Sequence, residues 1–154
     1  MRPREQRASA PHLHRSPMQL IRGIHNIRPE HHGCVATIGN FDGVHLGHAE
    51  IIKRLRKLGA HYGVPSLVVL FEPQPAEFFR RGRVPARLSR LREKFHLIEA
   101  RGIDRVLVLR FTEELAAMPP ERFVEDILVR KLGLKALIIG DDFRFGSGRG
   151  GDYN

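Results

Sequence analysis

The sequence predicts a doubly wound α/β fold, in which helices cover both faces of a parallel β-sheet. Four short runs are uniformly apolar, as expected of strands that are buried on both faces, and they span 35–38, 66–71, 106–109 and 136–139. The segments between them have apolar residues at helical spacing with charged residues in between, and they span 50–62, 89–101 and 119–132. Buried strands that alternate with amphipathic helices form parallel sheets.

Capping residues and helix breakers set the expected ends of the three helices. Gly63 follows the first helix and is expected to stop it, because glycine readily ends a helix. Ser89 is the expected N-cap of the second helix. Pro119 and Pro120 open the third, since proline is tolerated in a first turn, and Gly133 ends it.

The composition is that of a globular protein with one domain. The chain has 154 residues, of which 42% are hydrophobic and 28% are charged, and a domain of this size can bury a substantial core. Its single cysteine, Cys34, lies in an apolar run. We predict that Cys34 is a small buried hydrophobe in a reducing, cytoplasmic setting. No apolar stretch reaches the ~18 residues of a membrane span, so no membrane partner is expected.

The net charge of +9 attracts partners that carry phosphate, such as nucleotides, nucleic acid or acidic lipid. Residues 1–17 hold four arginines, three prolines and a single large aliphatic residue, Leu13. Such a segment cannot pack a core, so we expect 1–17 to be a disordered extension, with Met18 as the first residue of the domain.

Candidate functional residues follow the strands, because ligands of open α/β sheets bind beyond the carboxyl ends of the strands. The first strand leads into a glycine-rich segment, Gly39 to His48, and the last into a second one, Gly140 to Gly146. Gly39, Gly43 and Gly47 allow a close approach of backbone to a ligand. These segments are expected to meet at one edge of the sheet.

His45 and His48 are the candidate catalytic residues. Both lie where a helix is expected to begin, and the amides and dipole at a helix N-terminus favour an anion. An imidazole donates a hydrogen bond to a phosphate oxygen and can become a cation beside it. A zinc site needs further ligands at suitable spacing, so no metal ligand is named. The segment lacks the Gly-Lys-Ser/Thr of a P-loop.

The segment from Thr37 to His48 resembles the opening of bacterial FAD synthetases, which are usually fused to riboflavin kinase. Its His45-x-Gly47-His48 core is also that of the nucleotidylyltransferase superfamily, which has a Rossmann-like sheet. Four further stretches continue the resemblance in the same order, at 71–75, 85–88, 93–94 and 140–146. The resemblance covers everything from Met18 to Asn154.

The resemblance implies an FMN adenylyltransferase that joins the AMP of MgATP to FMN and releases pyrophosphate. His45 and His48 would hold the phosphates of ATP. The expected ATP-binding residues are Gly39, Asn40, Phe41, Asp42, Gly43 and Gly47, of which the first three would line the site by their backbone. The expected residues of the FMN site and of a flap over 72–88 are Pro73, Gln74, Arg87, Asp142, Phe143 and Phe145.

Several of these assignments have alternatives. Asp42 could cap the helix, Arg87 could belong to a solvated loop, and Phe143 and Phe145 could pack in the core. Gln74 stands where many family members have His, and glutamine keeps hydrogen bonding but cannot become a cation. The family's sheet domain and riboflavin kinase domain continue beyond Asn154, so 18–154 is expected to be an incomplete adenylyltransferase domain.

Three other functions are alternatives to this assignment. The histidine motif alone permits a related nucleotidylyltransferase with another acceptor, and truncation permits a remnant that binds nucleotide weakly. The charge suggests a nucleic-acid binder. That class needs aromatic residues interleaved with basic ones on one surface, and this pattern is not evident. No nucleic-acid partner is therefore expected, and the oligomeric state is open.

Overall fold

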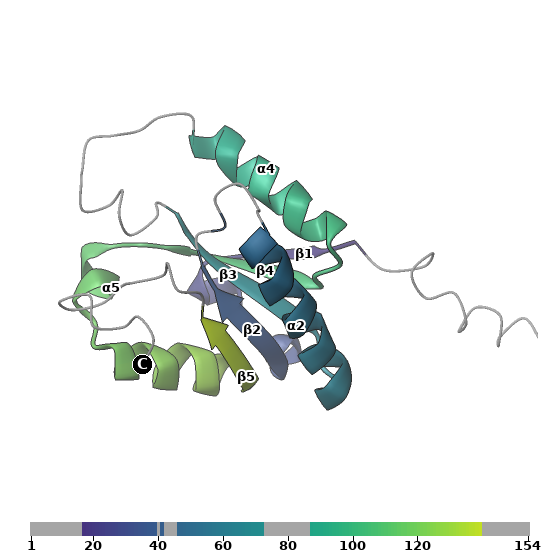
Figure 1. Ribbon diagram of the computed structural model, residues 1–154. Helices are drawn as coiled ribbons and strands as arrows, with labels where there is room; N and C mark the ends of the chain where they lie inside the picture. Colours follow the sequence, from purple (N-terminus) through teal and green to yellow (C-terminus); the bar gives the residue numbers. More distant parts are fainter. Residues whose placement is uncertain (1–16, 40, 42–45, 73–86, 140–154) are drawn as a thin grey trace, which may run out of the picture.

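The computed structural model describes residues 17–39, 41, 46–72 and 87–139, without the side chains of 46–47 and 87–90. Its centre is a five-stranded sheet with the strand order β1-β4-β3-β2-β5, in which every pair is parallel (Figure 1). The strands are β1 Gln19–Arg22, β2 Cys34–Ile38, β3 Ser66–Glu72, β4 Arg105–Arg110 and β5 Leu134–Ile139. The four predicted strands are confirmed, with ends that differ by a residue or two.

Strand β1 was not predicted from the sequence. It has four residues, of which only Ile21 is buried, and it pairs on one side with β4. An edge strand of this kind has no uniformly apolar run, so its composition does not distinguish it from a loop.

The helices are α2 Leu46–Tyr62, α4 Arg87–Ala100, α5 Glu113–Ala117, α6 Pro120–Phe123 and the π-helix η4 Val124–Lys131. Two short 3-10 turns, η2 Ile24–Asn26 and η3 Pro29–His31, follow β1. Gly63 and Gly133 have positive φ directly after α2 and at the end of η4, as predicted for helix stops.

Three predictions about the helices were wrong in detail. Helix α2 begins at Leu46, four residues before the expected start at Glu50. Helix α4 begins at Arg87, so Ser89 lies inside its first turn and is not its cap; Arg87 and Leu88 are good helix formers that extend the helix backwards. The third predicted helix is α6 followed by the π-helix. Its core residues Phe123, Ile127 and Leu132 are four and five residues apart, a spacing that the wider π turn keeps on one face.

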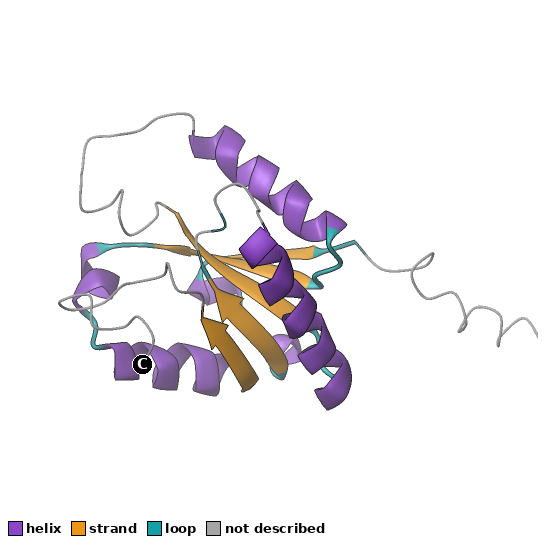
Figure 2. Cartoon of the chain, viewed as in Figure 1, coloured by secondary structure: helices purple, strands orange, loops and turns teal. Residues whose placement is uncertain are grey.

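Helices cover both faces of the sheet, as predicted (Figure 2). One core cluster lies under α2 and α4 and includes Val35, Ile52, Leu55, Val68 and Ile98. The other lies under α5, α6 and η4 and includes Ala36, Leu67, Leu115, Phe123 and Leu128. Successive residues of β2 and β3 alternate between the two clusters, because side chains of a strand point alternately to its two faces.

The strand order reverses at β2. The chain runs from β2 through α2 to the neighbouring β3, then on to β4, and returns across the sheet to β5 on the other side of β2. The carboxyl ends of β2 and β5 are therefore the topological switch point, where open α/β sheets bind ligands.

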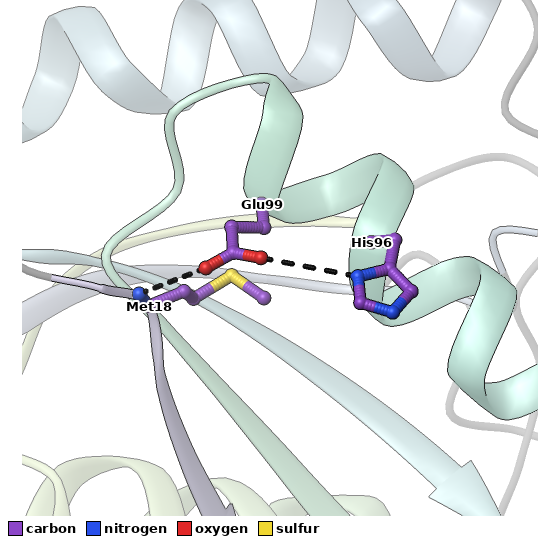
Figure 3. Close-up of polar contacts among 3 residues, drawn as sticks. All are labelled: Met18, His96 and Glu99. Atoms are coloured by element: carbon purple, nitrogen blue, oxygen red, sulfur yellow. Dashed lines mark hydrogen bonds and ion pairs between the residues drawn. The ribbon is translucent and has the colours of Figure 1, made fainter.

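Polar contacts tie the opposite, amino edge of the sheet. The Asp104 carboxylate accepts from the backbone N–H and the hydroxyl of Ser66, at 2.9 and 3.1 Å, and the Ser66 hydroxyl accepts from the Asp104 N–H. The Met18 N–H donates to the Glu99 carboxylate at 3.3 Å, and His96 lies 4.0 Å from the same carboxylate (Figure 3). The first group of contacts joins the start of β3 to the residue before β4, and the second joins the residue before β1 to the end of α4.

Cys34 is buried at the start of β2, as predicted, and burial raises the pKa of its thiol to about 11. The folded chain therefore holds this proton more tightly than the unfolded chain does, for which the reference value is 9.0. The protonated thiol of Cys34 therefore stabilises the folded chain. This stabilisation is fully present below the pKa of the unfolded chain and is lost as the pH rises through the pKa of the folded chain.

We predict that the free energy of unfolding of the parent chain falls by about 2 kcal/mol more than that of a Cys34→Ala variant between about pH 8.5 and about pH 10.5. Urea unfolding of both proteins measures the difference, and effects of other titrating groups cancel in the comparison. Parallel losses in the two proteins would show that Cys34 titrates alike in both states.

Candidate active site

The strand ends that precede the predicted site segments lie along one edge of the sheet. Ile38, the last residue of β2, pairs with Ile139, the last residue of β5. Glu72 at the end of β3 pairs with Arg110 at the end of β4. The segments that begin at Gly39 and Gly140 therefore start from the same edge of the sheet, as predicted, and the structure adds that their strands are neighbours. The second segment lies outside the described residues.

A buried threonine joins β2 and β5 just below this edge. The Thr37 hydroxyl donates to the carbonyl oxygen of Ile138 at 2.7 Å, and Thr37 is fully buried. This bond adds a side-chain link to the ladder between the two strands. Sequence reasoning missed its role, for which the only signal is one hydroxyl inside an apolar strand.

Gly39 continues directly from β2, and its N–H donates to the Val69 carbonyl oxygen at 3.3 Å. A Cβ atom at this position would lie 2.9 Å from Cε2 of Phe41, which is closer than packed atoms tolerate. The structure therefore needs glycine here because the ring of Phe41 lies against the backbone. The contact with Phe41 is a reason for this glycine that the sequence did not predict.

Phe41 has a left-handed backbone with φ of 51° and a side chain that is 1% exposed. This conformation costs an aromatic residue roughly 1–2 kcal/mol. Full burial of the ring contributes about 1.5–3 kcal/mol, which offsets that cost. The ring belongs to the core cluster under α2 and α4, together with Ile52 and Leu70. We expected Phe41 to line the nucleotide site by its backbone, and the structure adds that its side chain is a core residue.

His48 lies in the first turn of α2, close to where a helix was expected to begin, and is 6% exposed. Its ring packs against that of Phe41, with 4.7 Å between the centroids and a tilt of 40°. The structure thus brings Gly39, Phe41 and His48 together at the carboxyl end of β2. An imidazole at a helix start can donate to an anion that the helix dipole also favours.

The other predicted site residues are placed only in part. Gly47 is the second residue of α2, and Arg87 is the first residue of α4. The remaining ones lie outside the described residues, namely Asn40, Asp42, Gly43, His45, Pro73, Gln74, Asp142, Phe143 and Phe145. The spacing between His45 and His48 is therefore known from the sequence alone.

Lys94 is a buried cation on the same helix layer as His48. Its side chain is only 7% exposed, and Leu91, Phe95 and Ile98, its neighbours on α4, pack against the core. Burial of an ammonium group costs free energy unless the group is paired. We did not single out Lys94 for a site role from the sequence, where the signal is a lysine inside an apolar helical stripe.

Other features of the described part of the chain lie away from this edge. A cavity of about 450 Å³ at the amino edge is lined in part by Arg56, Ser66 and Asp104. His31 is buried near the same edge; its Nδ1 accepts from the Arg28 N–H at 2.8 Å, and burial, followed by the charge of Arg105, lowers the pKa of its imidazole.

Among the residues that the structure describes, no cluster of three or more His, Cys, Asp or Glu side chains could hold a metal ion. Within the same part of the chain, no helix combines the length and apolar character needed to cross a membrane.

We predict that Gly39→Ala lowers the free energy of unfolding by about 1–3 kcal/mol, because the new methyl group overlaps the Phe41 ring. In a Phe41→Ala background the ring is absent, so the same substitution should cost much less. Urea unfolding of the four proteins in this cycle measures both penalties. Equal penalties in the two backgrounds would mean that the ring is not the obstacle.

Comparison with known proteins places the chain in a family. The FAD synthetase family model matches residues 27–154. Relatives named bifunctional riboflavin kinase/FMN adenylyltransferase are 54% identical in Pseudomonas fluorescens, 50% in Escherichia coli strain K12 and 47% in Haemophilus influenzae. The matches cover 88–89% of this chain and 44% of each relative, so the chain spans less than half of their length.

The fold is also that of a solved structure described as a macrolide-efflux protein from Streptococcus pneumoniae. That structure is 22% identical, with a TM-score of 0.69, and the match covers 86% of this chain and 45% of the other. This likeness supports the Rossmann-like architecture alone. On the match of the family model over 27–154, the chain belongs to the FAD synthetase family.

Proposed function

We propose that this chain carries the FMN adenylyltransferase activity of its family and converts ATP and FMN to FAD and pyrophosphate. The observation that carries the proposal is the placement of Gly39, Phe41 and His48 at the end of β2, where β5 lies beside it. This is the switch point at which such sheets bind nucleotides. The names of the relatives, which include FMN adenylyltransferase, support the choice of substrates.

The proposed reaction is a single transfer at phosphorus. A phosphate oxygen of FMN attacks the α-phosphorus of ATP and forms a new P–O bond. The bond from the α-phosphorus to the bridging oxygen breaks, and its electron pair leaves with pyrophosphate. Positioning and charge stabilisation carry most of the catalysis in such transfers, so the protein needs well-placed donors and no nucleophile of its own.

His48 would donate to a phosphate oxygen of ATP and stabilise the charge that develops on pyrophosphate. His45 is assigned the same role on the basis of the motif. Asn40, Asp42, Gly43 and Gly47 are proposed to line the ATP site with Gly39 and Phe41. The helix dipole of α2 adds a favourable field for the phosphates.

The FMN site is proposed on resemblance to the family. Pro73, Gln74, Arg87, Asp142, Phe143 and Phe145 are its candidate residues, with the two phenylalanines as an aromatic wall for the flavin ring. Mg²⁺ is proposed to enter with ATP, as the charge of the triphosphate requires, and would neutralise phosphate oxygens.

The domain limits and the setting are also proposals. We assign residues 18–154 to the adenylyltransferase domain and 1–17 to an extension, because Met18 is buried and bonded to Glu99 just before β1 begins. The riboflavin kinase part of the relatives' name is assigned to the portion of their length that this chain does not match. We place the reaction in the cytoplasm, where a free thiol such as Cys34 stays reduced.

We predict that His48→Ala lowers the turnover of FAD formation by roughly 10²-fold, because a donor to developing charge is lost. His61→Ala is the matched control, since His61 lies at the exposed far end of the same helix and should leave turnover unchanged. FAD made from FMN, ATP and Mg²⁺ is measured by chromatography.

Equal turnover of the parent chain and the His48→Ala variant would contradict the proposed role of His48. If the 154-residue chain makes no FAD, the same three proteins are compared after extension to the length of the relatives. Continued absence of FAD there would refute the function, and transfer of AMP to another phosphate acceptor would favour a related nucleotidylyltransferase.

A further inference from the structure

We propose that the side chain of Phe41 is a positioning residue, whose ring holds the imidazole of His48 in the orientation that the reaction uses. The inference rests on the proposed function, because it assigns to Phe41 an effect on turnover through His48. It differs from the role expected from the sequence, in which only the backbone of Phe41 takes part.

The contact between the two rings is close and enclosed. The centroids are 4.7 Å apart, and Phe41 and His48 are 1% and 6% exposed. Tilted ring pairs at this separation gain free energy from ring–ring attraction, in addition to the gain from burying their apolar surface. An imidazole that packs in this way has fewer orientations open to it than one at an exposed helix start.

The Phe41 ring is itself held from its other sides. It lies over the backbone of Gly39, where a Cβ atom would approach to 2.9 Å, and it shares a core cluster with Ile52 and Leu70. The ring therefore cannot shift without a disturbance of β2, β3 or α2. A support that is fixed in the core can fix the group that packs against it.

The backbone of Phe41 has a left-handed conformation. Its φ of 51° is the only positive φ at a non-glycine residue in the described part of the chain. Strained backbone of this kind persists where the surrounding structure over-determines it, and it clusters at functional sites. Here the left-handed turn brings the ring back over Gly39 and beneath the first turn of α2 instead of continuing the line of β2.

The consequence for catalysis follows from the geometry of the donor. A donor stabilises developing charge only if it already points to where that charge forms. If Phe41 supplies this orientation, its loss should lower turnover more than ATP binding, and it should have no effect when His48 is absent. A residue that only fills the core would lower stability without such coupling.

The first test needs no activity. NMR of the ligand-free chain measures the three-bond couplings across χ1 of His48, which have the values of a single rotamer when the side chain is held in place. Phe41→Leu should move these couplings toward the averaged values of a side chain that samples several rotamers. Phe95→Leu, the same substitution on α4 against the same core cluster, should leave them unchanged. Single-rotamer couplings of His48 in folded Phe41→Leu would overturn the proposal.

The second test is a cycle of turnover measurements on the form of the chain that makes FAD. Phe41→Leu is expected to lower kcat about tenfold with little change in the KM for ATP, and Phe95→Leu to leave both unchanged. In the His48→Ala background, Phe41→Leu should have no further effect, since the two residues act as a unit. A full tenfold loss in that background, or unchanged kcat in the single variant, would overturn the positioning role.

If Phe41→Leu does not fold, a second variant, Gly39→Ala, tests the same proposal. Gly39→Ala keeps the ring and displaces it by the overlap of the new methyl group. It should move the χ1 couplings of His48 toward averaged values and lower kcat, and it should have no effect on kcat in the His48→Ala background. If the parent makes FAD and none of these effects is found, the positioning role is refuted while the proposed function stands. If no form of the chain makes FAD, the proposed function is refuted, and the NMR measurement alone decides whether Phe41 orients His48.

Discussion

The position of β2 within the sheet is the constraint on which the candidate site depends. All five residues of β2 are buried, and the strand pairs with β3 on one side and with β5 on the other. The chain leaves β2 toward one side of the sheet and returns to β5 from the other, so the two glycine-rich segments start from neighbouring strand ends. The buried bond from Thr37 to the Ile138 carbonyl strengthens this pairing directly below the site. A strand order without this reversal would separate the segments that the site requires.

From this constraint follows the turn that places His48. Strand β2 ends where Ile38 pairs with Val69, whereas β3 continues to Glu72. The Gly39 N–H donates to the Val69 carbonyl oxygen, and Phe41 lies in the core cluster that includes Leu70. The first turn of α2 then lies over the Phe41 ring and carries His48 to the end of the strand. The first turn of this helix thus packs on the Phe41 ring, and the glycine before that ring makes room for it.

Much of this arrangement could be predicted from the sequence, for physical reasons that differ between elements. Strands buried on both faces are uniformly apolar, so β2, β3, β4 and β5 were evident. Edge strand β1 and the short helix α5 have no such pattern, although Thr112, whose hydroxyl accepts from the Leu115 N–H, is a recognisable cap in retrospect. The place of His48 followed from the motif and the expected helix. The role of the Phe41 side chain did not, because a left-handed turn and a ring contact depend on tertiary packing that residue types do not reveal.

The central claim is that nucleotide binds at the carboxyl ends of β2 and β5, and a titration of the ¹⁵N-labelled chain with MgATP tests it most directly. Amide signals of Gly39, Phe41, His48 and Ile139 are predicted to shift with ATP concentration. Those of Gly63, Ser66 and Asp104, at the amino edge, are predicted to stay in place. Shifts confined to the amino edge, or no shifts at the ends of β2 and β5 when ATP is bound, would contradict the account.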